Sequence, residues 1–203
     1  MSLGAYLASE DSAVLREALG EYSGYSCLEI GAGNGGNLKE LRKRFKLVVG
    51  TDLVRPGILD WSDAGANYVI ADAASCFKRG SFELVVFNPP YVPSEGIVDR
   101  AVDGGTGGVE VARHFVMEAL DVVKSDGRVL FLLSSANPPD CLEEFACRGF
   151  AVKKVAEKRI FYESLCVFEA SADDGATEVG RGGERGWGAS DCPGRERSAE
   201  LCA

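Results

Sequence analysis

The fold is decided by residues 26–36, which read SCLEIGAGNGG. Residues 26–30 are predicted to form a strand, and the glycines after it approach a G-x-G-x-x-G pattern, which lets a ligand come close to the backbone. A helix is predicted to follow over residues 37–45, with Leu38, Leu41 and Phe45 as its apolar positions. A strand, a glycine loop and a helix in this order indicate the first unit of an α/β fold.

Predicted strands and helices alternate on both sides of this stretch. Further strands are expected at 47–50, 67–71, 83–87 and 128–133, and further helices at 9–19, 56–64, 109–123 and 138–147. Two last strands, 151–158 and 164–169, are expected to form an antiparallel pair. The pattern predicts an α/β, Rossmann-like sheet of seven strands, mostly parallel, with an antiparallel hairpin at its C-terminal edge.

Four predicted strands end in polar side chains. Glu29 closes the first, Asp52 and Asp72 follow the next two, and Asn88 follows the fourth. Because ligands of such sheets bind at the carboxyl ends of the strands, near the switch in strand order, this edge is the expected site.

The segment Asn88-Pro89-Pro90-Tyr91 is expected to form a rigid bend, since two prolines fix φ and remove two backbone donors. The Asn88 side chain and the Asn88 and Pro89 carbonyls could accept the hydrogens of an NH2 group, and the Tyr91 ring could cover its plane. Taken alone, the tetrapeptide fits a proline-stopped strand equally well.

The carboxylates narrow the choice of ligand for the glycine loop. Glu29 would repel a pyrophosphate but suits a cationic group, such as the aminopropyl end of S-adenosylmethionine; a capping or salt-bridged role is the alternative. Asp52 could accept hydrogen bonds from ribose hydroxyls, as it also could for NAD. Asp72 could accept from an adenine amino group, with the Ala73 N–H facing the ring, or it could cap a helix.

Residues 94–108 form a glycine-rich loop that we expect to be flexible and close to the substrate. The following helix is expected to bury Val111, Phe115, Ala119 and Val122. Its His114 is not expected to act in catalysis.

The composition of the chain excludes several classes of protein. The 203-residue chain has a net charge of −9, which argues against unaided binding to nucleic acid. It has neither an apolar run of about 18 residues, as a membrane span needs, nor a recognisable signal peptide. We therefore expect a cytoplasmic protein, with the nucleus as a second location. Seven scattered cysteines without a CxxC pair predict reduced thiols, no zinc site and no disulfide framework.

The chain is expected to divide at residue 170. Residues 1–170 would form the single domain. Residues 171–203 are rich in Gly, Arg and Glu and poor in apolar residues, so they are expected to form a disordered tail.

Together these features resemble the class I S-adenosylmethionine-dependent methyltransferases that modify amino groups. More narrowly, they resemble the HemK-type protein-glutamine methyltransferases of the short eukaryotic and archaeal branch, over residues 5–169. The resemblance rests on LEIGAGNG at 28–35, Asp52, Asp72, NPPY at 88–91, Tyr6 with SEDS at 9–12, DGGTGGVE at 103–110 and IFYESL at 160–165. Gly107 departs from the family, which commonly has Asp or Asn there.

The resemblance implies methyl transfer from S-adenosylmethionine to the glutamine amide nitrogen of the Gly-Gly-Gln motif in a peptide-chain release factor, leaving S-adenosylhomocysteine. It implies that the catalytic residues are Asn88, Pro89, Pro90 and Tyr91. The implied cofactor-binding residues are Ser12, Glu29, Gly31, Gly33, Asp52, Leu53, Asp72, Ala73 and Asn88.

The resemblance also implies a small zinc-binding activator subunit as partner. The apolar strand 67–71 is expected near a sheet edge, where such a partner could pair. No metal, no membrane and no direct nucleic-acid contact are expected. Three alternatives stay open: methylation of a nucleic-acid base, methylation of protein lysine, and a non-catalytic subunit of a methyltransferase pair. The intact segment 88–91 argues against the last.

Overall fold

The computed structural model describes residues 3–54, 65–97, 99, 101–138, 140–161 and 163–172. Its elements are α1 (Leu3–Leu19), β1 (Gly24–Ile30), α2 (Gly36–Leu41), β2 (Phe45–Asp52), β3 (Asn67–Ile70), β4 (Phe82–Phe87), η2 (Thr106–Gly108), α3 (Glu110–Val122), β5 (Val123–Ser134), α4 (Asp140–Cys147), β6 (Phe150–Ile160) and β7 (Glu163–Ala172). The helix predicted at 56–64 and the expected tail beyond Ala172 lie outside the described residues.

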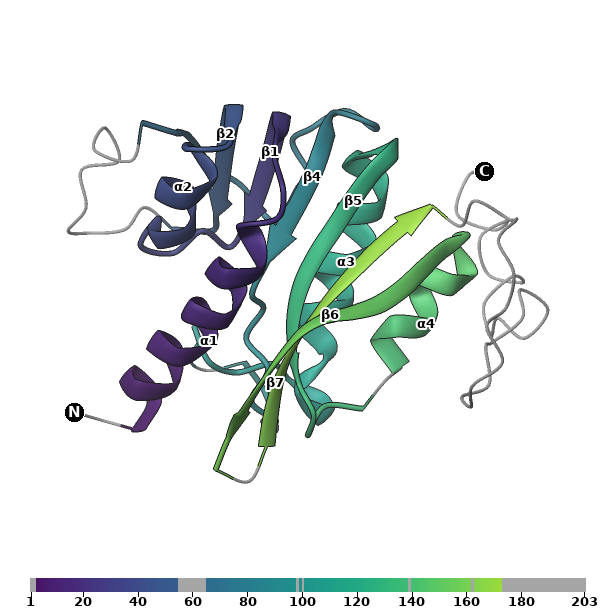
Figure 1. Cartoon of the computed structure of the whole chain (residues 1–203). Helices are drawn as coiled ribbons and strands as arrows, with labels where there is room; N and C mark the ends of the chain where they lie inside the picture. The colour runs from purple at the N-terminus through teal and green to yellow at the C-terminus, as the bar shows by residue number, and fades with distance from the viewer. Residues whose placement is uncertain are drawn as a thin grey trace.

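One seven-stranded sheet organises the domain (Figure 1). The strand order is β3-β2-β1-β4-β5-β7-β6, with parallel pairing from β3 through β5 and antiparallel pairing of β7 with β5 and β6. This confirms the predicted Rossmann-like sheet, its C-terminal hairpin and the edge position of β3. Consecutive strands β1 and β2 lie on one side of the switch in strand order, and β4 lies on the other side.

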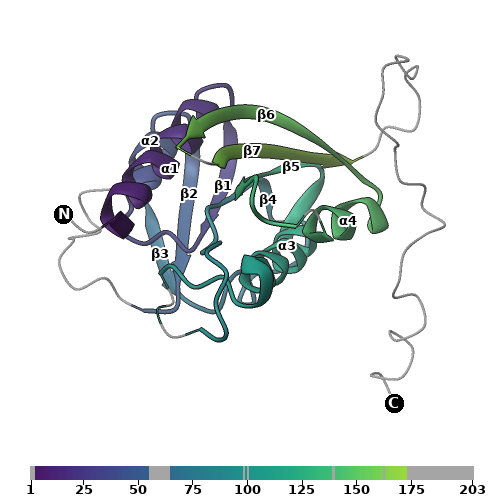
Figure 2. The ribbon, with the colours of Figure 1, turned by 90° about the horizontal axis from the view of Figure 1, so that it is seen from below.

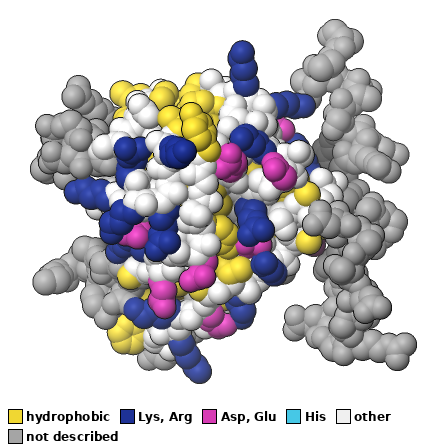
Figure 3. Space-filling view, turned by 45° about the horizontal axis from the view of Figure 1, so that its top comes forward, with side chains coloured by type: hydrophobic (Ala, Val, Ile, Leu, Met, Phe, Trp, Pro, Cys, Tyr) yellow, Lys and Arg dark blue, Asp and Glu magenta, His cyan; other side chains and the backbone are white. Residues whose placement is uncertain are grey.

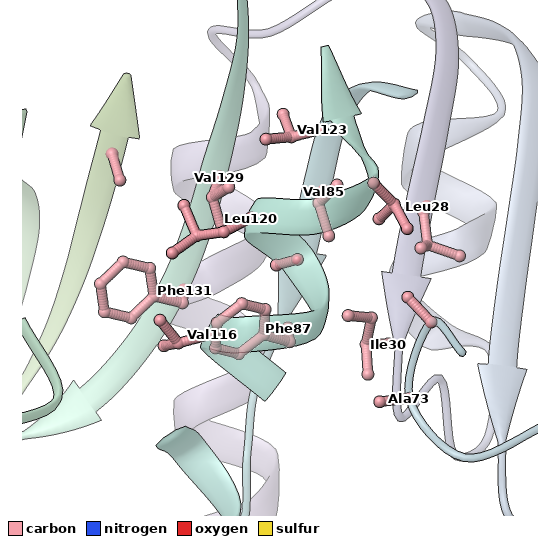
Figure 4. Packing of buried hydrophobic residues seen from close by; sticks show 14 of the residues in the cluster. Leu28, Ile30, Ala73, Val85, Phe87, Val116, Leu120, Val123, Val129 and Phe131 are labelled. Atoms are coloured by element: carbon pink, nitrogen blue, oxygen red, sulfur yellow. The ribbon is translucent and has the colours of Figure 1, made fainter. Parts of the chain in front are cut away.

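The sheet is covered on both faces, as Figure 2 shows from below. On one face, Leu28, Val85 and Phe131 point toward Val116 and Leu120 of α3 (Figure 4). These strand residues are buried on a parallel sheet, which explains their continuous apolar runs. The other face packs against α1 and α2 in a second cluster of buried residues, which includes Leu15, Leu19, Leu38, Leu41, Leu130 and Leu132. The two cores fix the sheet from both sides.

Two helices differ from the sequence prediction. Helix α2 ends at Leu41, and Phe45 begins β2, because the chain must reverse between Leu41 and Phe45 to reach the next parallel strand. In α3 the buried residues are Ala112, Val116, Ala119, Leu120 and Val122, so the buried face is turned by about one residue from the prediction. Ala119 and Val122 are confirmed as buried, whereas Val111 and Phe115 are only partly buried.

The cysteines also depart from one expectation. Cys27, Cys76 and Cys166 carry free thiols, but Cys147 is disulfide-bonded. The sequence spacing did not reveal this bond, since spacing does not show which thiols meet in a fold. In the part of the chain that the structure describes, no helix is long and apolar enough to cross a membrane.

Candidate active site

The carboxyl ends of β1, β2, β3 and β4 lie at the edge of the sheet that Figure 2 faces. Residues at these ends line a cavity. It has two adjoining parts, of about 370 Å³ and about 830 Å³. Both parts are lined by Gly31, Gly33, Asn88, Pro90 and Ala101, so they form one cavity. The cavity lies at the switch in strand order, where open α/β sheets bind their ligands.

Every residue that the sequence predicted for the site lines this cavity. The smaller part contains Ser12, Glu29, Gly31, Gly33, Asn88, Pro89, Pro90 and Tyr91. The larger part contains Gly31, Gly33, Asp52, Leu53, Asp72, Ala73, Asn88 and Pro90. The sequence did not predict Asp11, Arg16, Asn37, His114 and Phe115, which also line it. All five of these lie on helices rather than at strand ends.

Asn88 is held in one orientation by a buried carboxylate from α1. The Asn88 Nδ2 donates to Asp11 Oδ2 at 3.1 Å, and the Tyr91 hydroxyl donates to the same oxygen at 3.3 Å. Asp11 is 6% exposed, and its other oxygen accepts the Ser12 N–H. With its nitrogen occupied, Asn88 presents its Oδ1, which is buried and has no hydrogen-bond partner among the described residues. A buried acceptor without a partner marks a place for a donor from a ligand.

The backbone after Asn88 is fixed by the glycine-rich loop. Val92 and Asp103 form a β-bridge, and Gly104 N donates to Val92 O at 2.9 Å. A Cβ at Gly108 would lie 2.2 Å from the Tyr91 carbonyl oxygen. Gly104 packs against the same segment, since a Cβ there would lie 2.7 Å from the Pro90 carbonyl oxygen, so these two positions of the loop have no room for a side chain. Gly107, the departure from the family, has φ 65, a region that Asn and Asp also tolerate.

The Asn137 side chain adds a second support to the same backbone. Its Nδ2 donates to the Tyr91 carbonyl at 2.9 Å, and its Oδ1 accepts the Ser134 N–H at 3.0 Å. Tyr91 itself is 9% exposed, and burial, followed by the charge of Asp11, raises the pKa of its hydroxyl. Tyr91 is therefore neutral and serves as a donor and as an apolar wall.

Glu29 lies at the end of β1 with only 3% of its surface exposed. Its Oε1 accepts a hydrogen bond from Asn37 Nδ2 at 2.8 Å, while its Oε2 is buried without a partner. Burial raises the pKa of the Glu29 carboxyl to about 8, against the opposing effects of the Asn37 hydrogen bond and the Arg16 charge. A buried carboxyl in this state gains from a cationic ligand, because the cation stabilises its charged form.

The larger part of the cavity is lined by more exposed charged side chains, since Asp72 is 59% and His114 45% exposed. Asp52 Oδ2 accepts the Gly33 N–H at 2.9 Å, which ties the end of β2 to the glycine loop. Asp72 follows β3, and its Oδ1 lies 2.9 Å from His114 Nε2 on α3. Beside His114, the Phe115 ring lies 3.3 Å from the place of a Cβ on Gly31. Gly31, with φ 68, thus allows the loop to turn close to this ring.

These residues fit S-adenosylmethionine. Glu29 offers a buried acceptor for the ammonium group of the cofactor, and Asp52 offers a carboxylate for its ribose. Asp72 and Ala73 line the larger part of the cavity together with Asp52. Among the described residues, no group of three His, Cys, Asp or Glu side chains could hold a metal ion. The arrangement can hold an NH2 group at Asn88 beside a cationic ligand at Glu29.

Comparisons with known proteins identify two relatives of the chain. A protein of Methanocaldococcus jannaschii, assigned as a protein N5-glutamine methyltransferase, is 29% identical over 178 residues, which cover 81% of this chain and 90% of the relative. A chain of the E. cuniculi Mtq2–Trm112 complex, responsible for methylation of the eRF1 translation termination factor, is 31% identical. It superposes with a TM-score of 0.65 over 80% of this chain and 95% of its own length.

More distant structures share the fold alone. The N-methyltransferase NodS of Bradyrhizobium japonicum, with bound S-adenosylhomocysteine, is 13% identical with a TM-score of 0.58, over 81% of this chain and 86% of its own. No protein-family model matches the chain. The sheet order, the cavity and the two nearer relatives agree, and the chain belongs to the HemK-type class I S-adenosylmethionine-dependent protein-glutamine methyltransferases.

Proposed function

We propose that the substrate is the glutamine of the Gly-Gly-Gln motif in a peptide-chain release factor. The observation that carries the proposal is the buried Oδ1 of Asn88, which lacks a partner while Asp11 occupies the amide nitrogen. A glutamine amide offers the planar NH2 that this acceptor can bind. Support for the release factor comes from the E. cuniculi complex, which is responsible for methylation of eRF1. This substrate would place the enzyme in the cytoplasm.

The residues of the cavity would act by positioning. Asn88 Oδ1 accepts one hydrogen of the target NH2, the Pro89 carbonyl takes the other, and the Tyr91 ring covers the plane of the amide. Asp11 keeps Asn88 from turning its own NH2 toward the target. When bound, S-adenosylmethionine supplies the methyl group on a sulfonium. Holding the nitrogen in line with the sulfonium methyl lowers the entropic part of the barrier. The nitrogen takes the methyl group, the sulfur keeps the electron pair of the broken bond, and the proton leaves the nitrogen afterwards, so no strong base is needed before transfer.

We also propose a small activator subunit on the β3 edge. β3 is the outermost strand beside β2, and Ile70 at its end is 59% exposed. The neighbouring Leu53 and Val54 are exposed too, and Tyr68 joins them by donating to the Val54 carbonyl at 2.9 Å. An apolar, unpaired edge invites pairing with another chain. The E. cuniculi relative is a complex with Trm112, which supports a partner of this kind.

The surface charge disfavours a nucleic-acid substrate. Within the described residues, the larger part of the cavity is lined by Asp52, Asp72, Asp99 and Glu110 and by neither Lys nor Arg. Lys and Arg side chains instead spread over the face in Figure 3, which brings the top of Figure 1 forward, where the amino ends of β1, β2 and β4 lie. Phosphates near the cavity would face carboxylates, and binding to nucleic acid depends on cations.

Transfer of a labelled methyl group tests the proposal. The full chain, with and without the activator subunit, is incubated with a release factor, its Gln→Ala variant, a lysine-rich histone, tRNA and DNA. We expect label only in the unmodified release factor, at the glutamine by mass spectrometry. Equal labelling of the Gln→Ala variant, or labelling of the histone, tRNA or DNA alone, would overturn the assignment of the substrate.

A further inference from the structure

Besides Asp11, the smaller part of the cavity is lined by an acidic and a basic side chain that form no ion pair with each other. One is the carboxylate of Glu29, whose Oε2 has no hydrogen-bond partner among the described residues. The other is the guanidinium of Arg16, on α1. The ion pairs found in the described part of the chain do not include Arg16. Both side chains therefore line the same part of the cavity without forming an ion pair with each other.

Arg16 comes to this place because of its position on α1. It lies four residues after Ser12 and five after Asp11, so all three face the cavity, while Leu15 and Leu19 pack into the core. The guanidinium reaches the start of α2, since its Nη1 lies 3.4 Å from the place of a Cβ on Gly36. A larger residue at position 36 would displace it. Gly36 thus leaves room for Arg16 beside the glycine loop.

We propose that Arg16 binds the α-carboxylate of the cofactor's amino-acid end, while Glu29 binds the α-ammonium attached to the same carbon. The cofactor ends in a zwitterion, and a receptor for a zwitterion needs two opposite charges that are close but not joined. Arg16 and Glu29 provide this arrangement in the cavity. An arginine suits the task because its planar fork of donors matches a carboxylate.

The competing explanation is that Arg16 only neutralises Glu29. A neutralising partner would contact the buried carboxylate, and Glu29 Oε2 would then be satisfied. The structure instead gives Glu29 its one hydrogen bond from Asn37 and leaves Oε2 unpartnered. The influence of Arg16 on Glu29 is Coulombic and weaker than that hydrogen bond. Arg16 is therefore free to receive an anion of its own.

Calorimetric binding of cofactor analogues to the full chain tests this role without any methyl acceptor. The variants are Arg16→Leu, Arg16→Gln and Arg16→Lys, with Lys39→Leu as the matched control, because Lys39 is exposed on α2 and does not line the cavity. The ligands are S-adenosylhomocysteine and its decarboxylated analogue, which keeps the amine and loses only the carboxylate. Thermal unfolding of each free variant verifies that it folds.

We expect Arg16→Leu and Arg16→Gln to weaken S-adenosylhomocysteine about tenfold, as for one lost charge-assisted contact, and to leave the decarboxylated analogue within about twofold. Arg16→Lys should retain most of the affinity, and Lys39→Leu should change neither ligand. Equal losses for both ligands, or unchanged binding of S-adenosylhomocysteine, would overturn the role of Arg16. Since no methyl acceptor is present, either result leaves the proposed substrate untouched.

Discussion

The two parts of the cavity differ in the burial of their polar side chains and in whether these side chains already have partners. Around Asn88 and Glu29, the polar groups are buried, and three acceptor atoms, Asn88 Oδ1, Glu29 Oε2 and Asn37 Oδ1, have no partner among the described residues. Around Asp72 and His114, the side chains are 59% and 45% exposed and already contact each other. The first part is a preorganised set of buried acceptors without a partner among the described residues, and the second is an exposed rim whose side chains already contact each other.

This difference in burial predicts which part of the cavity contributes more to lowering the barrier of the reaction. Electrostatic interactions are strong where water is excluded and weak where it is present. In the buried part, a change at Asn88 should therefore act mainly on turnover and a change at Glu29 on the affinity for the cofactor, whereas changes at the rim should have smaller effects on affinity. Single substitutions in each part test this contrast.

Asn88→Ala should have the largest effect. It removes the buried acceptor for the target NH2, so we expect turnover to fall on the order of a thousandfold, in the range known for losing one preorganised group at a reacting centre. Binding of S-adenosylhomocysteine, measured by calorimetry, should change by less than about threefold. Undiminished methylation would remove Asn88 from the mechanism, and a collapse of cofactor binding would erase the contrast between the two parts.

Asp11→Asn should come next. The variant keeps the shape of the side chain but weakens the charge-assisted hydrogen bonds from Asn88 and Tyr91. We expect kcat to fall roughly thirtyfold to a hundredfold, about 2–3 kcal/mol, with KM for the protein substrate nearly constant. Tyr91→Phe removes only one of the two bonds and should cost several-fold. A change confined to KM would show that Asp11 acts on binding rather than on the orientation of Asn88.

Glu29→Gln should weaken S-adenosylhomocysteine by about tenfold, because a neutral amide replaces the partner of an ammonium group. At high pH, the same substitution should reduce the loss of stability of the free protein. The pKa of Glu29 is raised to about 8 in the folded chain. Its neutral form therefore adds stability that is complete below its ordinary pKa and is lost as pH rises through about 8.

The glutamine side chain of the Glu29→Gln variant does not ionise. The melting temperature of the variant should therefore fall less than that of the wild type between about pH 6 and pH 9. Differential scanning calorimetry of both proteins across this range measures the effect. Parallel losses in the two proteins would mean that Glu29 does not titrate there.

His114→Ala should have the smallest effect. The contact of His114 with Asp72 is exposed, and an exposed contact of this kind contributes at most about 1 kcal/mol, so the affinity for S-adenosylhomocysteine should fall by no more than about fivefold, and less at high salt. Calorimetric titrations at two salt concentrations provide the measurement. A loss as large as that of Glu29→Gln would show that the rim is preorganised as well, and the contrast between the two parts would fail.

The residues at strand ends could be predicted from the sequence. Each of Glu29, Asp52, Asp72 and Asn88 follows an apolar run, and parallel strands place their carboxyl ends at one edge. The residues on helices could not be predicted in this way. Phe115 was assigned to the core, but it lies beside the core stripe of α3 and lines the cavity. The rotation of a helix about its axis is set by packing, and periodicity gives it only to within about one residue.

Local patterns of apolar, glycine and proline residues were sufficient to predict the fold class and the edge of the sheet where the cavity lies. They also predict that residues 88–91 hold an NH2 group. Only the tertiary structure decided that Asp11 would orient Asn88, 77 positions away, and that Arg16 would face the same space as Glu29. Such contacts depend on how α1 docks on the sheet. Docking is fixed by the fit of many side chains from distant segments, which no local pattern contains.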